Sequence, residues 1–258
     1  MKIVFLGVGE AFDENLPNNS HLIITGKTKL LLDCGMTAAP QMWKLNSDPS
    51  FLDAVYISHW HADHYFGLPG LLLRMWENGR TRPLTIISRK GFKGQFQKLM
   101  DIAYLNFLQK FKYEIKILEV EAGKETKFSD LLLNFSPTVH SGENLAVKIS
   151  DGKNTMAYSG DGSPVAGTDF YKNLDLLILE TYLYNKEIIG HSSIISAISF
   201  AENNNVKCLA LTHMNRDFRK DELPKVREKI ISPAFAKATA GKDKIKIIIP
   251  EPMDEYNF

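Results

Sequence analysis

Residues 54–64 read Ala-Val-Tyr-Ile-Ser-His-Trp-His-Ala-Asp-His, an apolar run followed by three histidines and an aspartate. The apolar run predicts a short buried strand. His59 and His61 are two positions apart, so on an extended chain they point the same way, while Asp63 and His64 follow at the next bend. Imidazole and carboxylate are the usual ligands of zinc and similar ions. Burying them together without a metal would cost about 1–3 kcal/mol for each unsatisfied group. The stretch therefore predicts metal ligands at the end of a strand.

Outward from this stretch, apolar patterns and turn residues predict two runs of strands, each followed by helices. In the first half we expect strands over 2–6, 21–25, 29–32, 54–57 and 84–87, and helices over 67–77 and 92–108. In the second half we expect strands over 113–120, 131–136, 145–149, 155–159, 174–180, 206–211 and 245–249, and helices over 192–202 and 221–231. This order predicts an α/β fold, a four-layer αββα sandwich. We expect one domain over residues 1–258.

The composition favours a soluble globular protein without a strong charge bias. The chain has 31 basic and 30 acidic residues, so no overall positive charge draws it to nucleic acid or to an anionic membrane. No apolar run approaches the ~18 residues that span a bilayer. Cys34 and Cys208 are expected to be reduced, buried thiols. We therefore expect a cytoplasmic protein with no membrane partner.

The later histidines and aspartates extend the first motif into a known pattern. The motif H-x-H-x-D-H after a strand, in an α/β sandwich, resembles the metallo-β-lactamase superfamily. Dinuclear members of that superfamily add a histidine, an aspartate and a histidine, each at a strand end. This sequence supplies them in that order, at His140, Asp161 and His213. The resemblance therefore implies the metallo-β-lactamase fold and covers residues 2–213.

The same resemblance implies a pair of metal ions that share one carboxylate. The implied ligands are His59, His61 and His140 for one ion, Asp63, His64 and His213 for the other, and Asp161 as the bridge. Such ligands suit zinc, and also manganese or iron. A water shared by two divalent ions acts as a hydroxide-like nucleophile, which would attack phosphorus. The true β-lactamases usually lack the bridging aspartate, which argues against antibiotic hydrolysis.

Within the superfamily, the chain looks most like the ribonuclease Z group, the tRNA 3′-processing endonucleases. Residues 67–72 read Gly-Leu-Pro-Gly-Leu-Leu, which resembles the segment after the metal motif in that group. Residues 6–9, 18–20 and 31–35 also resemble it. The resemblance thus implies a metal-dependent phosphodiester hydrolase of the endoribonuclease type.

The segment Gly190-His191-Ser192-Ser193 resembles the His-Ser-Thr segment of ribonuclease Z. This implies that His191 protonates the leaving oxygen, with Glu180 holding the ring in the useful tautomer. By the same analogy Asp63 is a general base as well as a ligand. The alternative for His191 is that it only caps or precedes the helix expected over 192–202. His21 is interpreted as structural, and the residues that bind the substrate are not indicated.

The chain also departs from the ribonuclease Z pattern. Bacterial ribonuclease Z has a long flexible arm that clamps the tRNA elbow, whereas His140 and Asp161 here leave room only for a hairpin, with a turn at 151–154. Two basic stretches remain that either steer phosphate or form a solvated face. They are Arg89, Lys90, Lys93 and Lys98, and Arg216, Arg219 and Lys220. The segment 233–244 has no predicted role.

The leading hypothesis is a dinuclear, ribonuclease Z-like phosphodiester hydrolase acting on RNA, in tRNA 3′ processing. The alternative is a small-molecule phosphodiesterase that acts on cyclic nucleotides or cyclic phosphates. A thioester or lactone hydrolase is third, since it leaves residues 67–72 and His191 unexplained. A module that binds metal without turnover is the non-enzymatic alternative. Because members of this group are often dimers, a homodimer is also expected.

Overall fold

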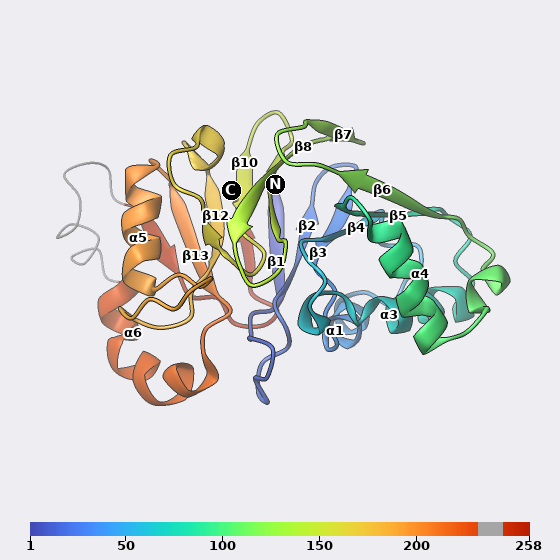
Figure 1. Ribbon diagram of the computed structural model, residues 1–258, viewed down its shortest axis with the longest axis horizontal. Helices are drawn as coiled ribbons and strands as arrows, with labels where there is room; N and C mark the ends of the chain where they lie inside the picture. The colour runs from blue at the N-terminus through green and yellow to red at the C-terminus, as the bar shows by residue number, and fades with distance from the viewer. Residues whose placement is uncertain (232–244) are drawn as a thin grey trace.

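Two β-sheets packed face to face form the middle of the fold, and helices cover the outer face of each sheet (Figure 1). The structure is a computed structural model that describes residues 1–231 and 245–258. The predicted four-layer αββα sandwich is therefore confirmed. The segment 233–244, which has no predicted role, falls outside the described residues.

The first sheet combines an antiparallel and a parallel part. Its strands, in order across the sheet, are β15 (Glu255–Asn257), β1 (Lys2–Gly7), β2 (Ser20–Ile24), β3 (Lys29–Leu32), β4 (Ala54–Ile57), β5 (Leu84–Arg89) and β6 (Ile115–Val120). The N-terminal strands β1 to β3 pair antiparallel. From β3 to β6 the strands are parallel, and helices form the crossovers between them.

The second sheet has the same mixed character. Its strands, in order, are β11 (Ser163–Pro164), β8 (Leu131–Val139), β9 (Leu145–Ser150), β10 (Thr155–Tyr158), β12 (Leu176–Glu180), β13 (Cys208–Thr212) and β14 (Lys246–Ile248), with β7 (Thr126–Phe128) paired to β8. The strands from β8 to β10 pair antiparallel, and those from β10 to β14 pair parallel. The β9–β10 hairpin turns at the predicted residues, where Asp151 N–H donates to the carbonyl of Asn154.

The helices divide between the two outer faces. On the first sheet lie α1 (Ala38–Leu45), α3 (Leu68–Glu77) and α4 (Phe92–Ala103), and on the second lie α5 (Ile194–Asn203) and α6 (Leu223–Ile231). The short helix α2 (Ala62–Tyr65) carries part of the histidine motif. Among the described residues, no helix combines the length and the apolar character needed to cross a membrane.

Alternation along the strands assigns side chains to the layers. In β1, Val4 and Leu6 contribute to the cluster under the helices, whereas Ile3 and Phe5 face the second sheet. This follows from the two-residue period of a strand, which sends successive side chains to opposite faces. A strand that is buried on both faces therefore needs apolar residues at nearly every position, as β1 has.

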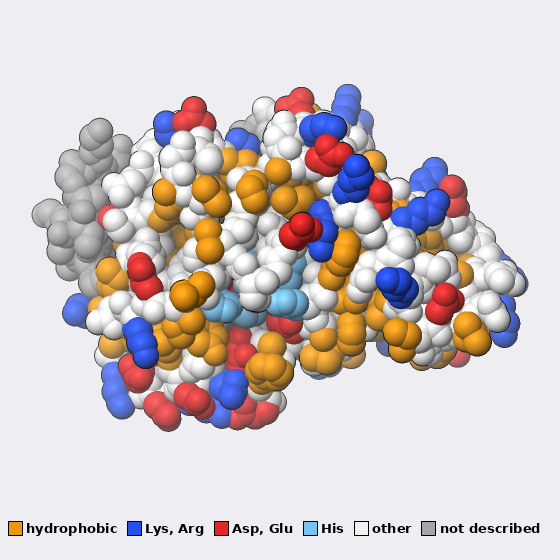
Figure 2. Space-filling model, viewed as in Figure 1, with side chains coloured by type: hydrophobic (Ala, Val, Ile, Leu, Met, Phe, Trp, Pro, Cys, Tyr) orange, Lys and Arg blue, Asp and Glu red, His pale blue; other side chains and the backbone are white. Residues whose placement is uncertain are grey.

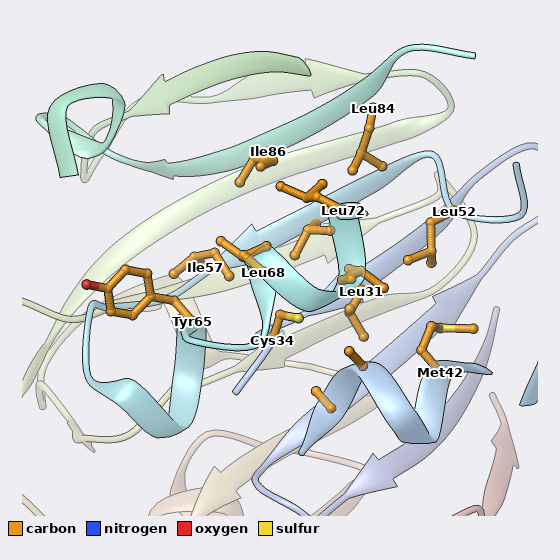
Figure 3. Packing of buried hydrophobic residues seen from close by; sticks show 14 of the residues in the cluster. Leu31, Cys34, Met42, Leu52, Ile57, Tyr65, Leu68, Leu72, Leu84 and Ile86 are labelled. Atoms are coloured by element: carbon orange, nitrogen blue, oxygen red, sulfur yellow. The ribbon is translucent and has the colours of Figure 1, made fainter. Parts of the chain in front are cut away.

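Helix α3 packs on the first sheet through its leucines. Figure 3 shows Leu68 and Leu72 lying over Ile57 and Leu84, and all four are fully buried. Cys34 lies among the same apolar side chains, and burial raises the pKa of its thiol. Both cysteines are free and buried, as predicted.

The predicted bounds of the helix over 92–108 are wrong at its C-terminal end. Helix α4 ends at Ala103, and Asn106 has a φ of 60°. Tyr104, with a φ of −151° and a ψ of 80°, already lies outside the helical conformation, and Phe107–Lys110 form a separate 3₁₀ turn after Asn106. The apolar spacing of the sequence continues through this break and does not reveal it.

Other differences concern helix starts. The helix predicted over 221–231 begins as a π-helical turn at Phe218–Glu222 and continues as α6. Helix α1 has no counterpart among the predicted helices. Pro40 lies in the first turn of α1, where the backbone N–H groups have no partner inside the helix and a proline is tolerated.

A buried cation holds the segment between α3 and β5. Arg80 is fully buried, and its guanidinium lies over the ring of Tyr113, 5.5 Å from the centroid. Its N–H groups donate to the backbone carbonyls of Pro49, Leu52, Arg82 and Pro83, at 2.7–2.9 Å. The sequence does not reveal this role, since an arginine after Asn78-Gly79 reads as a surface turn residue.

Replacing this cation tests its structural role. We expect Arg80→Met to lower the free energy of unfolding by about 3–5 kcal/mol, because four buried carbonyl groups lose their donors. Urea unfolding followed by circular dichroism measures the change. The matched control is Arg82→Met, whose side chain is 57% exposed and whose loss should cost less than about 1 kcal/mol. Equal losses in the two variants would show that Arg80 has no special role.

Candidate metal centre

The residues predicted as metal ligands lie together at the edge where several strands end. Among the described residues, histidine and carboxylate groups with ligand atoms within 4.8 Å of one another form overlapping sets. These sets are His59, His61, His140 and Asp161; Asp63, His64, Asp161 and His213; and Asp161, Glu180, His191 and His213. The structure thus brings together the whole predicted ligand set, with Glu180 and His191 beside it. Figure 2 shows histidines exposed in the middle of this face.

The first set is a group of imidazoles in contact with one another. His140 Nε2 lies 3.2 Å from His61 Nδ1 and 3.5 Å from an Asp161 carboxylate oxygen. The ring of His59 lies 4.6 Å from that of His61 and 4.9 Å from that of His140, between centroids. Nitrogens this close repel unless a proton or a cation lies between them.

The second set surrounds two carboxylates. One Asp63 oxygen lies 3.2 Å from His64 Nε2 and 3.5 Å from His213 Nε2. Asp161 contacts His213 Nδ1 at 3.4 Å through its other oxygen, Oδ1. His213 has a φ of 60°, a conformation that non-glycine residues rarely adopt and that often occurs at functional sites.

Asp161 lies between the two sets. Its Oδ2 faces His140 at 3.5 Å and His64 at 4.0 Å, and its Oδ1 faces His213 and His191. Burial would raise the pKa of this carboxyl, but the surrounding histidines, with His213 first, hold the pKa well below its usual range. Asp161 is therefore an anion in reach of both groups of imidazoles.

The atoms at this centre fit a bound cation. Several of their buried polar atoms have no hydrogen-bond partner, which in most proteins is rare and costly. These atoms are His59 Nε2, His64 Nε2, His140 Nδ1, His213 Nδ1 and Asp161 Oδ1. Imidazole nitrogens and carboxylate oxygens suit zinc, manganese and iron. The site can therefore hold divalent metal.

A buried carboxylate outside the predicted set orients this centre. Asp33 is fully buried, and its Oδ2 lies 2.7 Å from His64 Nδ1. The same oxygen accepts from the hydroxyls of Ser58 and Tyr158, each at 2.7 Å. Ser58 Oγ lies in turn 3.0 Å from His59 Nδ1. Asp33 thus holds His64 directly and His59 through one hydroxyl, which leaves both Nε2 atoms facing the centre. The sequence signal for Asp33 was its place in the stretch 31–35 that resembles ribonuclease Z.

Glycines allow this carboxylate to approach the histidine motif. Cys34 N–H donates to the carbonyl of His64, and Gly67 N–H donates to the carbonyl of Cys34. A Cβ on Gly35 would lie 1.8 Å from the carbonyl oxygen of Asp63, so no larger residue fits there. A Cβ on Gly67 would lie 2.1 Å from the carbonyl oxygen of Gly35, so this glycine has a packing reason as well as a family resemblance.

His191 is held by an acid and an aromatic ring. Its Nδ1 lies 3.2 Å from Glu180 Oε2 and 3.3 Å from Asp161 Oδ1. Its ring stacks on that of Tyr182 at 5.0 Å, and Tyr182 accepts a hydrogen bond from Asn215. Glu180 is fully buried and also accepts from the backbone of Ser192, just before α5. Ser193 is the N-cap of α5, so His191 does not cap that helix.

The charges around His191 favour its protonated form. Burial lowers the pKa of this imidazole, but hydrogen bonds and charges from Asp161 and Glu180 outweigh burial and raise the pKa to about 10. Burial also lowers the pKa of the His64 imidazole. The negative charges of Asp63 and then Asp33 outweigh burial and raise that pKa above its usual value. The carboxylates of Asp161 and Glu180 therefore stabilise the imidazolium form of His191.

His21 lies apart from the centre. It is fully buried, with the rings of Phe5 and Tyr158 edge-on at 5.2 Å, and burial lowers its pKa to about 3. A neutral imidazole packed between two aromatic rings agrees with the structural interpretation.

One of the two basic stretches is neutralised by acids from a single loop. The pairs are Arg216–Glu10, Arg219–Asp13 and Lys220–Glu14. The Arg219 pair has two hydrogen bonds, at 2.7 and 2.9 Å, and the Asp13 side chain is fully buried. These pairs offset much of the positive charge of the stretch, and its contact with phosphate stays a prediction. The same pairs fix the loop over 10–16 beside His213.

Metal affinity tests the role of Asp33. We expect Asp33→Asn and Ser58→Ala to weaken zinc binding by about 10- to 100-fold, because each loosens the orientation of a histidine that faces the centre. Competition with a chromophoric chelator measures the affinity. Asp130→Asn is the matched control, since that carboxylate accepts from Thr25 and Thr28 on another turn and touches none of the candidate ligands, so affinity should stay unchanged. A folded Asp33→Asn protein with wild-type affinity would contradict the assignment.

Comparison with solved structures supports the fold seen here. The metallo-beta-lactamase fold protein YhfI from Bacillus subtilis superposes with a TM-score of 0.80 at 24% identity, covering 99% of this chain and 98% of that one. The short form of human tRNase Z (ELAC1) gives a TM-score of 0.79 at 19% identity, covering 100% and 99%. The predicted metallo-β-lactamase fold is therefore confirmed.

Among curated proteins, the chain is similar to several ribonucleases Z. It is 28% identical to "Ribonuclease Z" of Methanocaldococcus jannaschii, over 100% of this chain and 97% of that protein. It is 32% identical to "Ribonuclease Z" of Methanosarcina mazei, but that alignment spans 58% of this chain and about half, 48%, of the relative. The chain is thus a ribonuclease Z-like hydrolase of the metallo-β-lactamase fold.

One family model extends over most of the chain. It is described as "Anti-Pycsar protein Apyc1" and matches residues 1–231, from β1 to the end of α6. That span includes all the candidate ligands and both residues of the His191–Glu180 pair. A match over this length shows that the chain belongs to the Anti-Pycsar protein Apyc1 family.

Proposed function

We propose that the protein hydrolyses phosphodiester bonds at a centre of two divalent ions, for which zinc suits the donor atoms best. The observation that carries the proposal is the position of Asp161, whose two oxygens face separate groups of histidines. One ion would take His59, His61 and His140, and the other Asp63, His64 and His213, with Asp161 shared between them. The ribonuclease Z names of the relatives support the same reaction class.

The bound ions and the side chains have separate tasks. Two divalent ions in these sets would lower the pKa of a water between them and neutralise the charge that builds up on the phosphoryl oxygens. Asp63, which has one oxygen facing His64 and His213, would also accept the proton of the attacking water. His191 donates the proton that the leaving oxygen needs, and Glu180 and Tyr182 keep its ring in place.

The substrate that the curated relatives favour is the 3′ end of a precursor tRNA. The similarity to the Methanocaldococcus jannaschii protein extends over the full length of both chains, including the metal centre. Its name, "Ribonuclease Z", gives an RNA phosphodiester as the bond to be cleaved.

A small cyclic phosphodiester is the second candidate substrate, and the β9–β10 hairpin favours it. The hairpin between His140 and Asp161 is a tight turn at 151–154, so no arm that could hold a tRNA elbow occurs there. The alignment with the Methanocaldococcus jannaschii protein extends over 327 positions, which is longer than this chain of 258 residues, so the relative has segments without a counterpart here. A cyclic mononucleotide needs no such contact.

Leaving-group dependence tests the role of His191. We expect His191→Ala to reduce the rate on bis(p-nitrophenyl) phosphate by less than about tenfold and the rate on an ester with a sugar leaving group by about 10²- to 10⁴-fold. Nitrophenolate leaves without a proton, whereas a sugar oxygen requires one. Tyr182→Ala should show the same pattern more weakly, and Tyr182→Phe should not. An equal loss on both esters would assign His191 to binding or structure.

Direct comparison of substrates tests the reaction itself. Purified, zinc-loaded protein is incubated with a precursor tRNA that has a 3′ trailer and, separately, with a nucleoside 3′,5′-cyclic phosphate. We expect hydrolysis of at least one phosphodiester, lost by about 10³-fold or more in His64→Ala. Cleavage after the discriminator base favours the first substrate, and turnover of the cyclic nucleotide alone favours the second. Inertness toward both, and toward bis(p-nitrophenyl) phosphate, would refute the proposed function.

A further inference from the structure

The turn that carries Asp161 has a glycine on each side of the aspartate. Gly160 has a φ of 70°, and a Cβ there would lie 2.4 Å from Asn144 Oδ1. A Cβ on Gly162 would lie 2.4 Å from Thr138 Oγ1. The two glycines therefore let this turn approach Asn144 and Thr138 more closely than residues with a side chain would allow. The backbone around Asp161 thus packs against two residues that do not belong to the candidate ligands.

Asn144 ties this turn to the loop that carries His140. Its side-chain amide donates to the backbone carbonyl of Ser159, at 2.8 Å, and to the hydroxyl of Thr138. Thr138 N–H donates in return to the backbone carbonyl of Asn144, at 3.2 Å. Both N–H groups of the amide are thus in use, one on each segment. His140 lies between Thr138 and Asn144 in the sequence, so the loop that this pair closes is the one that presents His140.

The same asparagine lies beside the residues that orient His59. Leu145, the next residue along the chain, donates its N–H to the carbonyl of Ser58 at 3.1 Å. The hydroxyl of Ser58 lies 3.0 Å from His59 Nδ1, and both Asn144 and Ser58 are buried. A Cβ on Gly160 would also lie 2.8 Å from Ser58 Cβ. Three segments that bear candidate ligands, 58–64, 138–144 and 159–162, therefore meet around Asn144.

The side chain of Asn144 acts here through its N–H groups alone. Its Oδ1 is buried and has no hydrogen-bond partner. A buried acceptor without a partner is uncommon and costs stability. The oxygen therefore gains nothing at this position, and what the amide supplies is the pair of donors that joins Ser159 to Thr138.

We propose that Asn144, with Thr138 as its partner, is a positioning residue that holds the carboxylate of Asp161 where both ions can share it. This role rests on the proposed function, in which Asp161 is the shared ligand. Sharing requires both oxygens to be placed at once, Oδ2 at 3.5 Å from His140 Nε2 and Oδ1 at 3.4 Å from His213 Nδ1. Asn144 secures the first contact, because it fastens the turn of Asp161 to the loop of His140.

Loss of this contact falls mainly on one ion. The first set has Asp161 as its only carboxylate, beside three imidazoles, whereas the second set also contains Asp63. An ion in the first set would therefore lose its only anionic ligand if Asp161 moved toward His213, and an anion attracts a divalent cation far more strongly than a neutral ring does. His61 in the first set is also exposed. The ion of the first set is thus the one that depends on Asn144.

Stepwise zinc affinity separates this role from a purely structural one. We expect Asn144→Ala and Thr138→Val to weaken the binding of the more loosely held zinc ion by about 10- to 100-fold, and that of the tighter ion by less than about threefold. Thr138→Ser keeps the acceptor for Asn144 and should bind both ions as the wild type does. Titration against chromophoric chelators of graded affinity measures both steps. The matched control is Asn204→Ala, which removes a hydrogen bond to the Phe200 carbonyl at the end of α5 and should change neither step.

Magnetic coupling between the ions provides a readout that depends on neither affinity nor turnover. Manganese also suits these donor atoms, and two manganese ions that share a carboxylate are spin-coupled. At manganese concentrations that fill both sites, we expect the paramagnetic resonance spectrum of a coupled pair from the wild type and Thr138→Ser. Asn144→Ala and Thr138→Val should give a larger share of uncoupled ions.

The outcomes distinguish this role from the proposed function. Because Thr138→Val alters one half-buried hydroxyl, it tests the role even where Asn144→Ala unfolds. Equal weakening of both zinc steps, or wild-type affinity and coupling in folded Asn144→Ala and Thr138→Val, overturns the positioning role while the two-ion centre stands. A wild-type protein that binds only one zinc ion refutes the two-ion centre itself.

Discussion

The buried carboxylate of Asp33 is the contact on which the centre depends. It binds the far side of His64 and, through the hydroxyl of Ser58, the far side of His59. Without it, the rings of His64 and His59 would lose these partners, and nothing would hold their unpartnered Nε2 atoms toward the centre. The close approach of residues 33–35 to the histidine loop requires glycine at position 35, where a side chain would collide with Asp63. The orientation of the candidate ligands His59 and His64 therefore depends on how residues 33–35 pack against the histidine loop.

Much of the fold and the site could be predicted because the signals are local. The strand ending at Ile57 and the histidines after it occur within a few residues, and the alternating apolar pattern shows which strands are buried. The later residues His140, Asp161 and His213 were placed by family resemblance, and the structure shows them in contact. That these seven residues are the metal ligands remains a prediction.

The rest of the structure depends on contacts between distant segments, which a pattern in one segment cannot show. Asp33 and His64 are 31 residues apart, and Tyr158 reaches the same carboxylate from the other sheet. Arg216 and Arg219 read as free cations in the sequence, but their partners, Glu10 and Asp13, lie 206 positions away. The guanidinium of Arg89 stacks on the ring of Trp60, a contact between separate segments that the sequence pattern does not show either. The early end of α4, at Tyr104, does not change the apolar spacing of the sequence.

Diffraction from crystals of zinc-loaded protein, measured at the zinc absorption edge, tests the central claim most directly. The account predicts two anomalous peaks, one among His59, His61 and His140 and the other among Asp63, His64 and His213, with Asp161 in contact with both. A single peak, or peaks that Asp161 does not join, would contradict a shared-carboxylate centre.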